Sequence, residues 1–378
     1  MLLSHGWGDG LIPALSTIDF YQLLTENLKD EKLKDSVLSA EQDKGGFEML
    51  RKLFVSAFIL GLFAALPAEA RTDRIKVRGA SLEGNLEGNS PERDVLVVLP
   101  PNYDSNPDKR YPVIYFLHGF FATLTAYDEL VKFQDAVDEA AKAGNEVIVV
   151  VPDANTKWKG AMYGASVTTG DFPLFIAQDL VKHIDSNYRT LARPESRGLS
   201  GHSMGGFGTL KIAMLYPGTF SSIFAMAPCC LSPNNYTVEQ VQSALAMNSE
   251  QIASGGFGQL AAGASMAAWA PDPNNPPHYI MNGVKDGAID PLFNARMRAN
   301  SPLVMFPQYL PSMRALKAIQ LEVGDKDSLI RDDTWMHEEL NKFGIRHEWK
   351  VFDGDHGNRV APRFRSELLP FFGRHLAR

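Results

Sequence analysis

The segment Gly201-His202-Ser203-Met204-Gly205 has the residue types and the spacing of a nucleophile elbow, a tight turn that presents a reactive serine. Such a turn joins a strand to a helix, and the serine hydroxyl projects from it. Glycine at the flanking positions has no Cβ that would collide with the neighbouring backbone. An apolar segment precedes this motif, and a helical pattern over residues 204–216 follows it. We therefore predict that Ser203 is a nucleophile.

A serine nucleophile needs a general base, and the base needs an acid that orients it. The predicted strand 318–323 is followed by Asp327, and the predicted strand 347–352 is followed by His356. Both residues therefore lie at carboxyl ends of strands, the edge where α/β sheets place their sites. We predict that His356 is the base and that Asp327 orients it. The alternatives for the acid are Asp325 first, and then Asp332, Asp333 and Asp355.

The near-continuous apolar run 111–117 predicts a strand that is covered on both faces, and it ends in His118-Gly119-Phe120. The loop after an early strand commonly supplies half of an oxyanion hole. We expect the backbone N–H groups of Phe120 and Met204 to stabilise the oxyanion. Four aromatic residues near these segments suit an aryl or acyl group of a substrate, namely Phe121, Trp158, Tyr163 and Trp269.

These motifs together resemble the esterase-D-type "putative esterase" family of α/β-hydrolases. That family includes feruloyl and acetyl-xylan esterases, S-formylglutathione hydrolases and mycolyltransferases. The resemblance extends from Val95 to the C-terminus and implies that Ser203, Asp327 and His356 form a catalytic triad. It leaves the ester open, because the family's substrates range from small thioesters to polymer-linked aromatics. The matching segments are Tyr111–Phe121, Val147–Asp153, Arg197–Leu210, Phe220–Cys230, Leu321–Asp327 and Phe352–Gly357.

Strand and helix patterns alternate along the chain, which predicts an α/β-hydrolase fold with a mostly parallel central sheet and helices on both faces. Roughly eighty residues separate Cys230 from the strand before the acid, far more than an ordinary connection. We expect this insertion, residues 231–313, to form a cap over the site, and the alternative is a helical decoration away from it. The expected strands are 94–100, 111–117, 146–151 and 220–227, and the expected helices are 126–143 and 172–188.

The only two cysteines of the chain are neighbours, Cys229 and Cys230, so they cannot link distant segments. We expect two reduced, packed thiols, and the alternative is a vicinal disulfide in an exported protein. No pair of histidines has the spacing of metal ligands. We therefore expect neither a metal nor another cofactor.

The N-terminal region has the features of an export signal. A short basic stretch, the apolar run 53–66 and the small-x-small sequence Ala68-Glu69-Ala70 predict a bacterial signal peptide over residues 49–70. The apolar run is shorter than the ~20 residues of a membrane-spanning helix, so we expect no membrane anchor after cleavage. Residues 1–48 then lie upstream of the true start, as a mistranslated or disordered segment. The alternative for residues 53–66 is a buried helix.

The remainder, residues 71–378, is expected to be a single domain. The net charge is −7 and the sequence has no basic runs, so nothing in its charge pattern indicates nucleic-acid binding. We predict an exported serine esterase, periplasmic or secreted, that acts on a small-molecule or polymer-linked carboxylic ester. The alternatives are an acyltransferase with an alcohol acceptor, an S-formylglutathione-type thioesterase and a catalytically inactive ligand-binding relative. The oligomeric state stays open.

Overall fold

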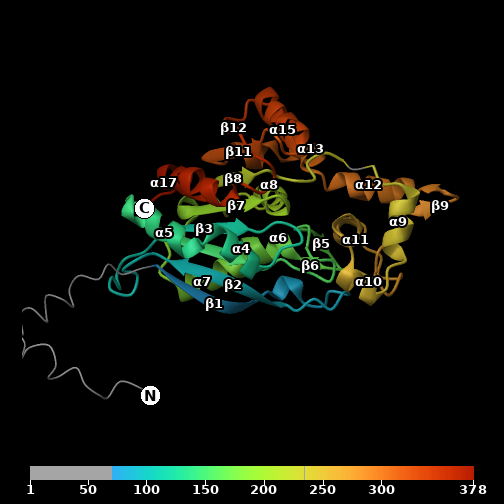
Figure 1. Cartoon of the computed structure of the whole chain (residues 1–378), viewed down its shortest axis with the longest axis horizontal. Coiled ribbons are helices and arrows are strands. Elements are labelled where there is room, and N and C mark those ends of the chain that lie inside the picture. The colour runs from blue at the N-terminus through green and yellow to red at the C-terminus, as the bar shows by residue number, and fades with distance from the viewer. Residues whose placement is uncertain (1–69, 234) are drawn as a thin grey trace, which may run out of the picture. The chain divides into compact units, whose positions relative to one another are not determined.

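The computed structural model describes residues 70–233 and 235–378, and an eight-stranded sheet forms the centre of this part (Figure 1). The predicted leader segments 1–48 and 49–70 lie outside the described residues, except for Ala70. The strand order is β1-β2-β4-β3-β7-β8-β11-β12, and all pairs are parallel except β1–β2 and β2–β4. The mostly parallel sheet of the predicted fold is thereby confirmed. The strands are β1 (Arg71–Arg78), β2 (Glu92–Leu99), β3 (Val113–Leu117), β4 (Ile148–Pro152), β7 (Arg197–His202), β8 (Ser222–Met226), β11 (Ala318–Gly324) and β12 (Glu348–Phe352).

The inner strands are buried on both faces, which is why they read as continuous apolar runs. In β3, Val113, Tyr115 and Leu117 belong to the hydrophobic cluster on one face, and Ile114 and Phe116 belong to the cluster on the other. The sheet therefore separates two hydrophobic cores.

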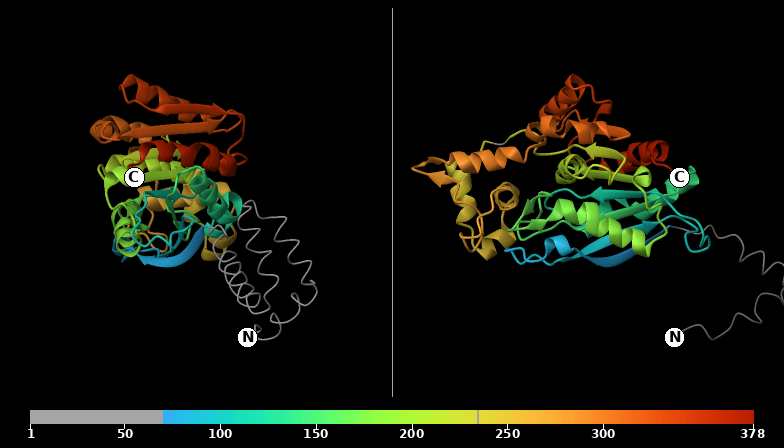
Figure 2. Two further views of the ribbon diagram at one scale, coloured as in Figure 1. Left: turned by 90° about the vertical axis from the view of Figure 1, so that its left-hand side faces the viewer. Right: turned by 180° about the vertical axis from the view of Figure 1, so that it is seen from behind.

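Helices cover both faces of the sheet (Figures 1 and 2). On the face of Phe116 lie α4 (Leu124–Val131), α5 (Phe133–Lys142), α16 (Val360–Arg363), η5 (Phe364–Leu368) and α17 (Leu369–His375). On the face of Tyr115 lie α6 (Phe172–Leu174), η2 (Phe175–Leu180), α7 (Val181–Asn187), α8 (Met204–Leu215) and α15 (Ile330–Lys342). This double covering buries β7 and nearly all of β11, the strands that precede Ser203 and Asp327.

Two local features differ from the sequence-based expectation. The expected single helix 126–143 is two helices, because Lys132 adopts a left-handed conformation with φ of 51° between α4 and α5. The edge strand β1 was not anticipated, since its mostly polar side chains are largely exposed and give no apolar run. It is held instead by pairing with β2 along all eight of its residues.

The insertion 231–313 folds into a series of helices, of which those within residues 238–299 lie beyond one end of the sheet (Figure 1), whereas those within residues 302–314 pack against α8. They are α9 (Val238–Leu245), α10 (Ser249–Ser254), α11 (Phe257–Trp269), α12 (Pro291–Ala299), α13 (Pro302–Met305), η4 (Phe306–Tyr309) and α14 (Leu310–Arg314), with a hairpin of β9 (Val284–Lys285) and β10 (Ala288–Ile289). A second hairpin, β5 (Ala165–Ser166) and β6 (Gly170–Asp171), packs against α11. Two short 3-10 turns complete the fold, η1 (Ala80–Leu82) and η3 (Pro194–Ser196). In residues 70–233 and 235–378, no helix has both the length and the apolar character needed to cross a bilayer.

Candidate active site

Ser203 lies at the sharp turn between β7 and α8, with φ of 58° and ψ of −116°. The turn brings α8 against the end of β3, so that a Cβ on Gly205 would lie 1.9 Å from the carbonyl oxygen of Leu117. A Cβ on Gly201 would lie 2.4 Å from the backbone of Gly205. Only glycine fits at these two positions, and the close approach therefore requires the Gly-x-Ser-x-Gly spacing.

The side chain of His356 joins Ser203 to Asp327. Its Nε2 lies 2.9 Å from the Ser203 hydroxyl, and its Nδ1 lies 2.7 Å from the Asp327 carboxylate. Because the carboxylate only accepts, Nδ1 carries the proton and Nε2 accepts from the serine hydroxyl. The Asp327 side chain is fully buried, whereas that of His356 is 41% exposed. This arrangement can remove the serine proton and stabilise the imidazolium that results.

Asp327 is held in its charged form. Burial alone would raise its pKa, but hydrogen bonds from His356 and from the Leu329 N–H outweigh burial, and the net shift of the pKa is downward. The carboxylate is therefore ionised at neutral pH and can orient the imidazole.

Among the described residues, none of the four alternative carboxylates hydrogen-bonds to the imidazole of His356. Asp325 accepts from the Gly354 N–H at 2.9 Å, and Asp355 accepts from backbone N–H groups of the next turn. Asp332 accepts from the Ser232 hydroxyl. The Asp333 carboxyl group is buried, its two oxygens have no hydrogen-bond partner among the described residues, and burial raises its pKa well above the usual range. Of the five carboxylates considered, the geometry selects Asp327.

The predicted oxyanion-hole residues lie beside the elbow. A Cβ on Gly119 would be 3.4 Å from the Ser203 Cβ, so the loop after β3 contacts the nucleophile directly. Within the described chain, neither the Phe120 N–H nor the Met204 N–H donates to another protein group. Two unpaired donors next to a serine can stabilise the oxyanion of an acyl-transfer intermediate.

His118 orients one of these donors. The Ala154 N–H donates to its Nε2 at 2.8 Å, so its Nδ1 carries the proton and donates to the Gly119 carbonyl at 2.8 Å. The Gly119 carbonyl and the Phe120 N–H belong to one planar peptide and point in opposite directions. Holding the carbonyl therefore fixes the direction of the N–H. Burial lowers the pKa of His118, which keeps the ring neutral for this role.

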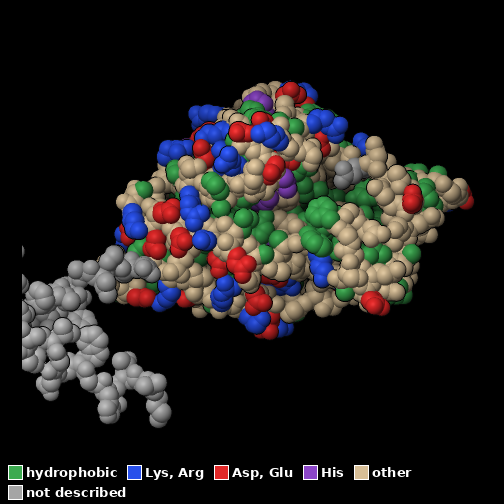
Figure 3. Space-filling model, viewed as in Figure 1, with side chains coloured by type: hydrophobic (Ala, Val, Ile, Leu, Met, Phe, Trp, Pro, Cys, Tyr) green, Lys and Arg blue, Asp and Glu red, His purple; other side chains and the backbone are tan. Residues whose placement is uncertain are grey.

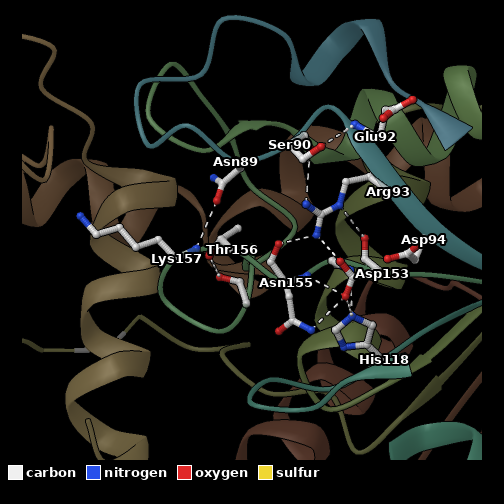
Figure 4. Close-up of polar contacts among 12 residues, drawn as sticks. Asn89, Ser90, Glu92, Arg93, Asp94, His118, Asp153, Asn155, Thr156 and Lys157 are labelled. Carbon is white, nitrogen blue, oxygen red and sulfur yellow. Dashed lines mark hydrogen bonds and ion pairs between the residues drawn. The ribbon is translucent and has the colours of Figure 1, made fainter. Parts of the chain in front are cut away.

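A polar network behind His118 holds the segment that it contacts (Figure 4). The buried Arg93 guanidinium donates to the Asp153 carboxylate and to the Asn155 carbonyl. Asp153 in turn lies 3.8 Å from the His118 Nε2. The network links the antiparallel strand β2 to the loop after β4, which also supplies the Ala154 N–H that donates to His118.

A second buried histidine links the oxyanion loop to the base. The Gly119 N–H donates to the Tyr127 hydroxyl at 2.9 Å, and that hydroxyl donates to the His202 Nδ1 at 2.7 Å. The His202 Nε2 donates to the His356 carbonyl at 2.7 Å. Burial lowers the pKa of His202 to about 4, so the ring stays neutral near pH 7. Tyr127 had no signal in the sequence, because its role depends on contacts with distant segments.

A cavity of about 550 Å³ opens in front of Ser203 and His356. Helix α11 lines it with small residues spaced on one face, Gly258, Ala261, Ala262 and Ser265. The other lining residues are Phe120, Met162, Cys229, Cys230, Asn235, Tyr236, Gln240, Phe257, Ser328 and Leu329. None of these described residues is an Asp, Glu, Lys or Arg. Figure 3 shows hydrophobic side chains gathered beside a histidine in the middle of one face.

An aromatic cluster forms one side of the cavity. The Phe257 ring, 61% exposed, meets the Phe120 ring edge to face with centroids 5.3 Å apart. Phe121 is 50% exposed and lies 6.2 Å from Phe257, just outside the lining residues. Residues 235–265 of the insertion thus form part of the cavity wall, as expected for a cap. The sequence could not single out Phe257, because no local pattern shows which side chains of the insertion face the cavity.

The prediction that Trp158, Tyr163 and Trp269 contact substrate is wrong. All three side chains are buried and none lines the cavity. Trp158 packs against Gly263, Tyr163 packs against Gly208, and Trp269 packs on the Phe207 ring at 5.5 Å. These rings fill the core beneath the insertion. In the described ranges, no group of three or more His, Cys, Asp or Glu side chains is arranged to hold a metal ion.

The hydrogen bonds that join Ser203, His356 and Asp327 predict different effects of two neighbouring substitutions on the rate of serine labelling. Asp327→Asn should slow the labelling of Ser203 by a fluorophosphonate by about 10⁴-fold, because the amide favours the wrong His356 tautomer. Asp325→Asn is the matched control, since the new amide oxygen still accepts from the Gly354 N–H. It should label at nearly the normal rate. The labelling rates of both variants are measured by stopping the reaction at a series of times. Slower labelling of Asp325→Asn than of Asp327→Asn would assign the acid to Asp325.

Comparison with known proteins identifies the family of the chain. The family model described as "Putative esterase" matches residues 89–374. An esterase of Mycobacterium tuberculosis is 33% identical over 130 residues, which cover 34% of this chain and 27% of that protein. An S-formylglutathione hydrolase of Mus musculus is 26% identical over 153 residues, which cover 35% of this chain and 51% of that protein. The chain thus spans about half the length, or less, of these curated relatives.

Solved structures share the fold over most of the described residues. A ferulic acid esterase has a TM-score of 0.59 at 20% identity, covering 82% of this chain and 100% of that chain. An S-formylglutathione hydrolase from Agrobacterium tumefaciens has a TM-score of 0.54 at 17% identity, covering 83% of this chain and 98% of that chain. These similarities confirm the α/β-hydrolase fold. Together with the family match over residues 89–374, they place the chain in the "Putative esterase" family of α/β-hydrolases.

Proposed function

We propose that this protein hydrolyses a neutral carboxylic ester through an acyl-enzyme formed on Ser203. The observation that carries the proposal is the continuous hydrogen-bonded series from Asp327 through His356 to the Ser203 hydroxyl. Membership of an esterase family supports the same chemistry.

Acylation follows from the positions of these groups. As the Ser203 oxygen attacks the ester carbonyl, His356 accepts its proton, and Asp327 stabilises the imidazolium. The negative charge that develops on the carbonyl oxygen is stabilised by the N–H groups of Phe120 and Met204. Each such donor typically contributes about 10²–10³ in rate. His356 then protonates the leaving alcohol, and the acyl group stays on Ser203.

Deacylation repeats these steps with water. The exposed side of the His356 ring allows a water molecule to approach, and His356 removes its proton as the oxygen attacks the acyl carbonyl. Ser203 leaves and recovers its proton from the imidazolium. An alcohol in place of water would give acyl transfer, so the acceptor is tested below.

The uncharged cavity supports an ester without charged groups near the reacting carbonyl. Burying a charge without a partner is costly, and the described lining offers no Lys, Arg, Asp or Glu to pair with one. Glutathione carries two carboxylates and an ammonium group, so this lining favours an ester over a glutathione thioester.

Ser203→Ala should fold normally, lose fluorophosphonate labelling and lose turnover of p-nitrophenyl acetate. A panel of short acyl, long acyl and hydroxycinnamoyl esters, together with S-formylglutathione, should show turnover of the neutral esters above that of the thioester. Adding an alcohol acceptor separates hydrolysis from transfer, which product analysis by mass spectrometry detects. Normal turnover by Ser203→Ala would reject Ser203 as the nucleophile. Faster turnover of S-formylglutathione than of the neutral esters would reject a neutral ester as the preferred substrate.

The positions of two aromatic residues predict opposite effects on specificity and stability. Phe257→Ala should change the order of kcat/KM across the ester panel, by about 1–3 kcal/mol for the most affected ester, because its ring faces the cavity. Trp269→Ala should lower kcat/KM for all esters by a similar factor. It should also reduce the free energy of unfolding by about 3–5 kcal/mol, because its ring is buried on Phe207. Kinetics and thermal unfolding of both variants measure the two effects. A uniform loss in Phe257→Ala would argue against a cavity role.

Export is also proposed, from the signal-like sequence of residues 49–70. Strand β1 begins at Arg71, so cleavage after Ala70 would leave every pair of that strand intact. N-terminal sequencing of the protein from its native host should give Arg71 as the first residue. A mature chain that retains residues 1–48 would contradict this proposal.

A further inference from the structure

The two cysteines of the chain both lie in the wall of the cavity that contains Ser203 and His356. Their side chains are partly exposed and are not joined by a disulfide. The sulfur atoms are 2.8 Å apart, and one thiol donates a hydrogen bond to the sulfur of the other. The proposed hydrolysis uses neither thiol, so their joint position next to the nucleophile has no role in that mechanism.

The backbone around the pair is held from several sides. The Cys229 N–H donates to the Ser203 carbonyl at 3.1 Å, and the Leu231 carbonyl accepts from the Leu303 N–H at 3.1 Å. Just upstream, the Ala227 N–H donates to the Glu322 carbonyl at 2.7 Å. Cys230 itself adopts the left-handed region with φ of 60°. These bonds hold the segment in place, so the nearest sulfur to each cysteine is that of its neighbour.

We propose that Cys229 and Cys230 are a site of oxidative modification, where an oxidising disulfide converts the two thiols into a vicinal disulfide within the substrate cavity. The Cys230 thiolate attacks one sulfur of the oxidant RS–SR, forming a mixed disulfide and releasing RS⁻, which takes up the proton lost by Cys230. The Cys229 thiol then loses its proton and attacks the Cys230 sulfur, and the second RS group leaves as RSH. Two thiols and one RSSR thus give one intramolecular disulfide and two RSH.

The order of attack follows from the surroundings of Cys229. The hydrogen bond with Cys230 and burial raise the pKa of the Cys229 thiol well above its ordinary value, and the neighbouring Asp333 carboxyl adds to this shift. A thiol that stays protonated is a poor first nucleophile. Cys230 therefore attacks first, and Cys229 resolves the mixed disulfide.

The modification changes the wall of the cavity beside Ser203. Closing the ring through the peptide bond between the two residues fixes both side chains and removes both S–H groups. Cys229 also contacts the elbow through its N–H. The rate with a given acyl group should then depend on the redox state of the pair. This kinetic consequence rests on the proposed esterase function, whereas formation of the disulfide does not.

Intact-mass spectrometry tests the modification. The full-length protein is treated with dithiothreitol or with the uncharged disulfide hydroxyethyl disulfide, and then with N-ethylmaleimide under denaturing conditions. The reduced protein should take up two maleimides, and the oxidised protein should take up none and be lighter than the unlabelled reduced protein by two hydrogen atoms. Two free thiols after oxidation, or a stable mercaptoethanol adduct on the wild type, would overturn the proposal.

Single variants test the order of attack. After treatment with hydroxyethyl disulfide, Cys229→Ser should accumulate a mercaptoethanol adduct on Cys230, because the resolving thiol is absent. Cys230→Ser should acquire the adduct on Cys229 much more slowly. Faster modification of Cys229 would overturn the assignment of Cys230 as the attacking thiol. Peptide mapping locates the adduct, and the measurement does not require esterase activity.

Kinetics of the oxidised and reduced protein test the effect on the cavity. The kcat/KM ratio between a long and a short acyl p-nitrophenyl ester should change by about threefold or more on oxidation. The Cys229→Ser/Cys230→Ser double variant should show no such redox response. An unchanged ratio in a protein that forms the disulfide would overturn the cavity effect. Disulfide formation in a protein without turnover in either state would instead reject the proposed hydrolysis.

Discussion

The close approach of α8 to the end of β3 is the constraint on which the site depends. It places the backbone of Gly205 against the Leu117 carbonyl, where a Cβ would come within 1.9 Å, and it forces Ser203 into a left-handed conformation. Such strain persists only where the surroundings impose it. Here β8 does so, because the Ser203 N–H donates to the Met226 carbonyl at 2.9 Å. The serine hydroxyl is therefore fixed above the sheet before any substrate binds.

Two neutral histidines fix the loops around the elbow through hydrogen bonds. His118 fixes the peptide that presents the Phe120 N–H, and His202 bonds to the backbone carbonyl of His356. Both rings are buried, and burial lowers the pKa of each. A neutral imidazole has one donor and one acceptor, so each ring can bond to two partners of opposite kind. Charged rings would lose the acceptor, and the hydrogen bonds to Ala154 and Tyr127 would be lost with it.

The insertion supplies more of the residues that line the cavity than the strand ends of the sheet do. Helix α11 presents small residues and Phe257, while the strand ends supply Ser203, His356 and the two cysteines. This division lets the wall of the cavity vary without moving the groups that perform the chemistry. The cysteine pair is the exception, since its backbone bonds directly to the nucleophile.

Local patterns alone predicted the elbow, the inner strands, Ser203 and His356, and they placed Asp327 first among five candidate carboxylates. Each depends on near neighbours in the chain, such as glycine spacing or an apolar run that ends in a polar loop. Tertiary structure alone decided which of five carboxylates faces His356 and which aromatic rings line the cavity. Trp269 and Phe257 lie on the same helix, yet one packs on Phe207 and the other on Phe120. Contacts between segments distant in the chain make that choice, and no local pattern encodes them.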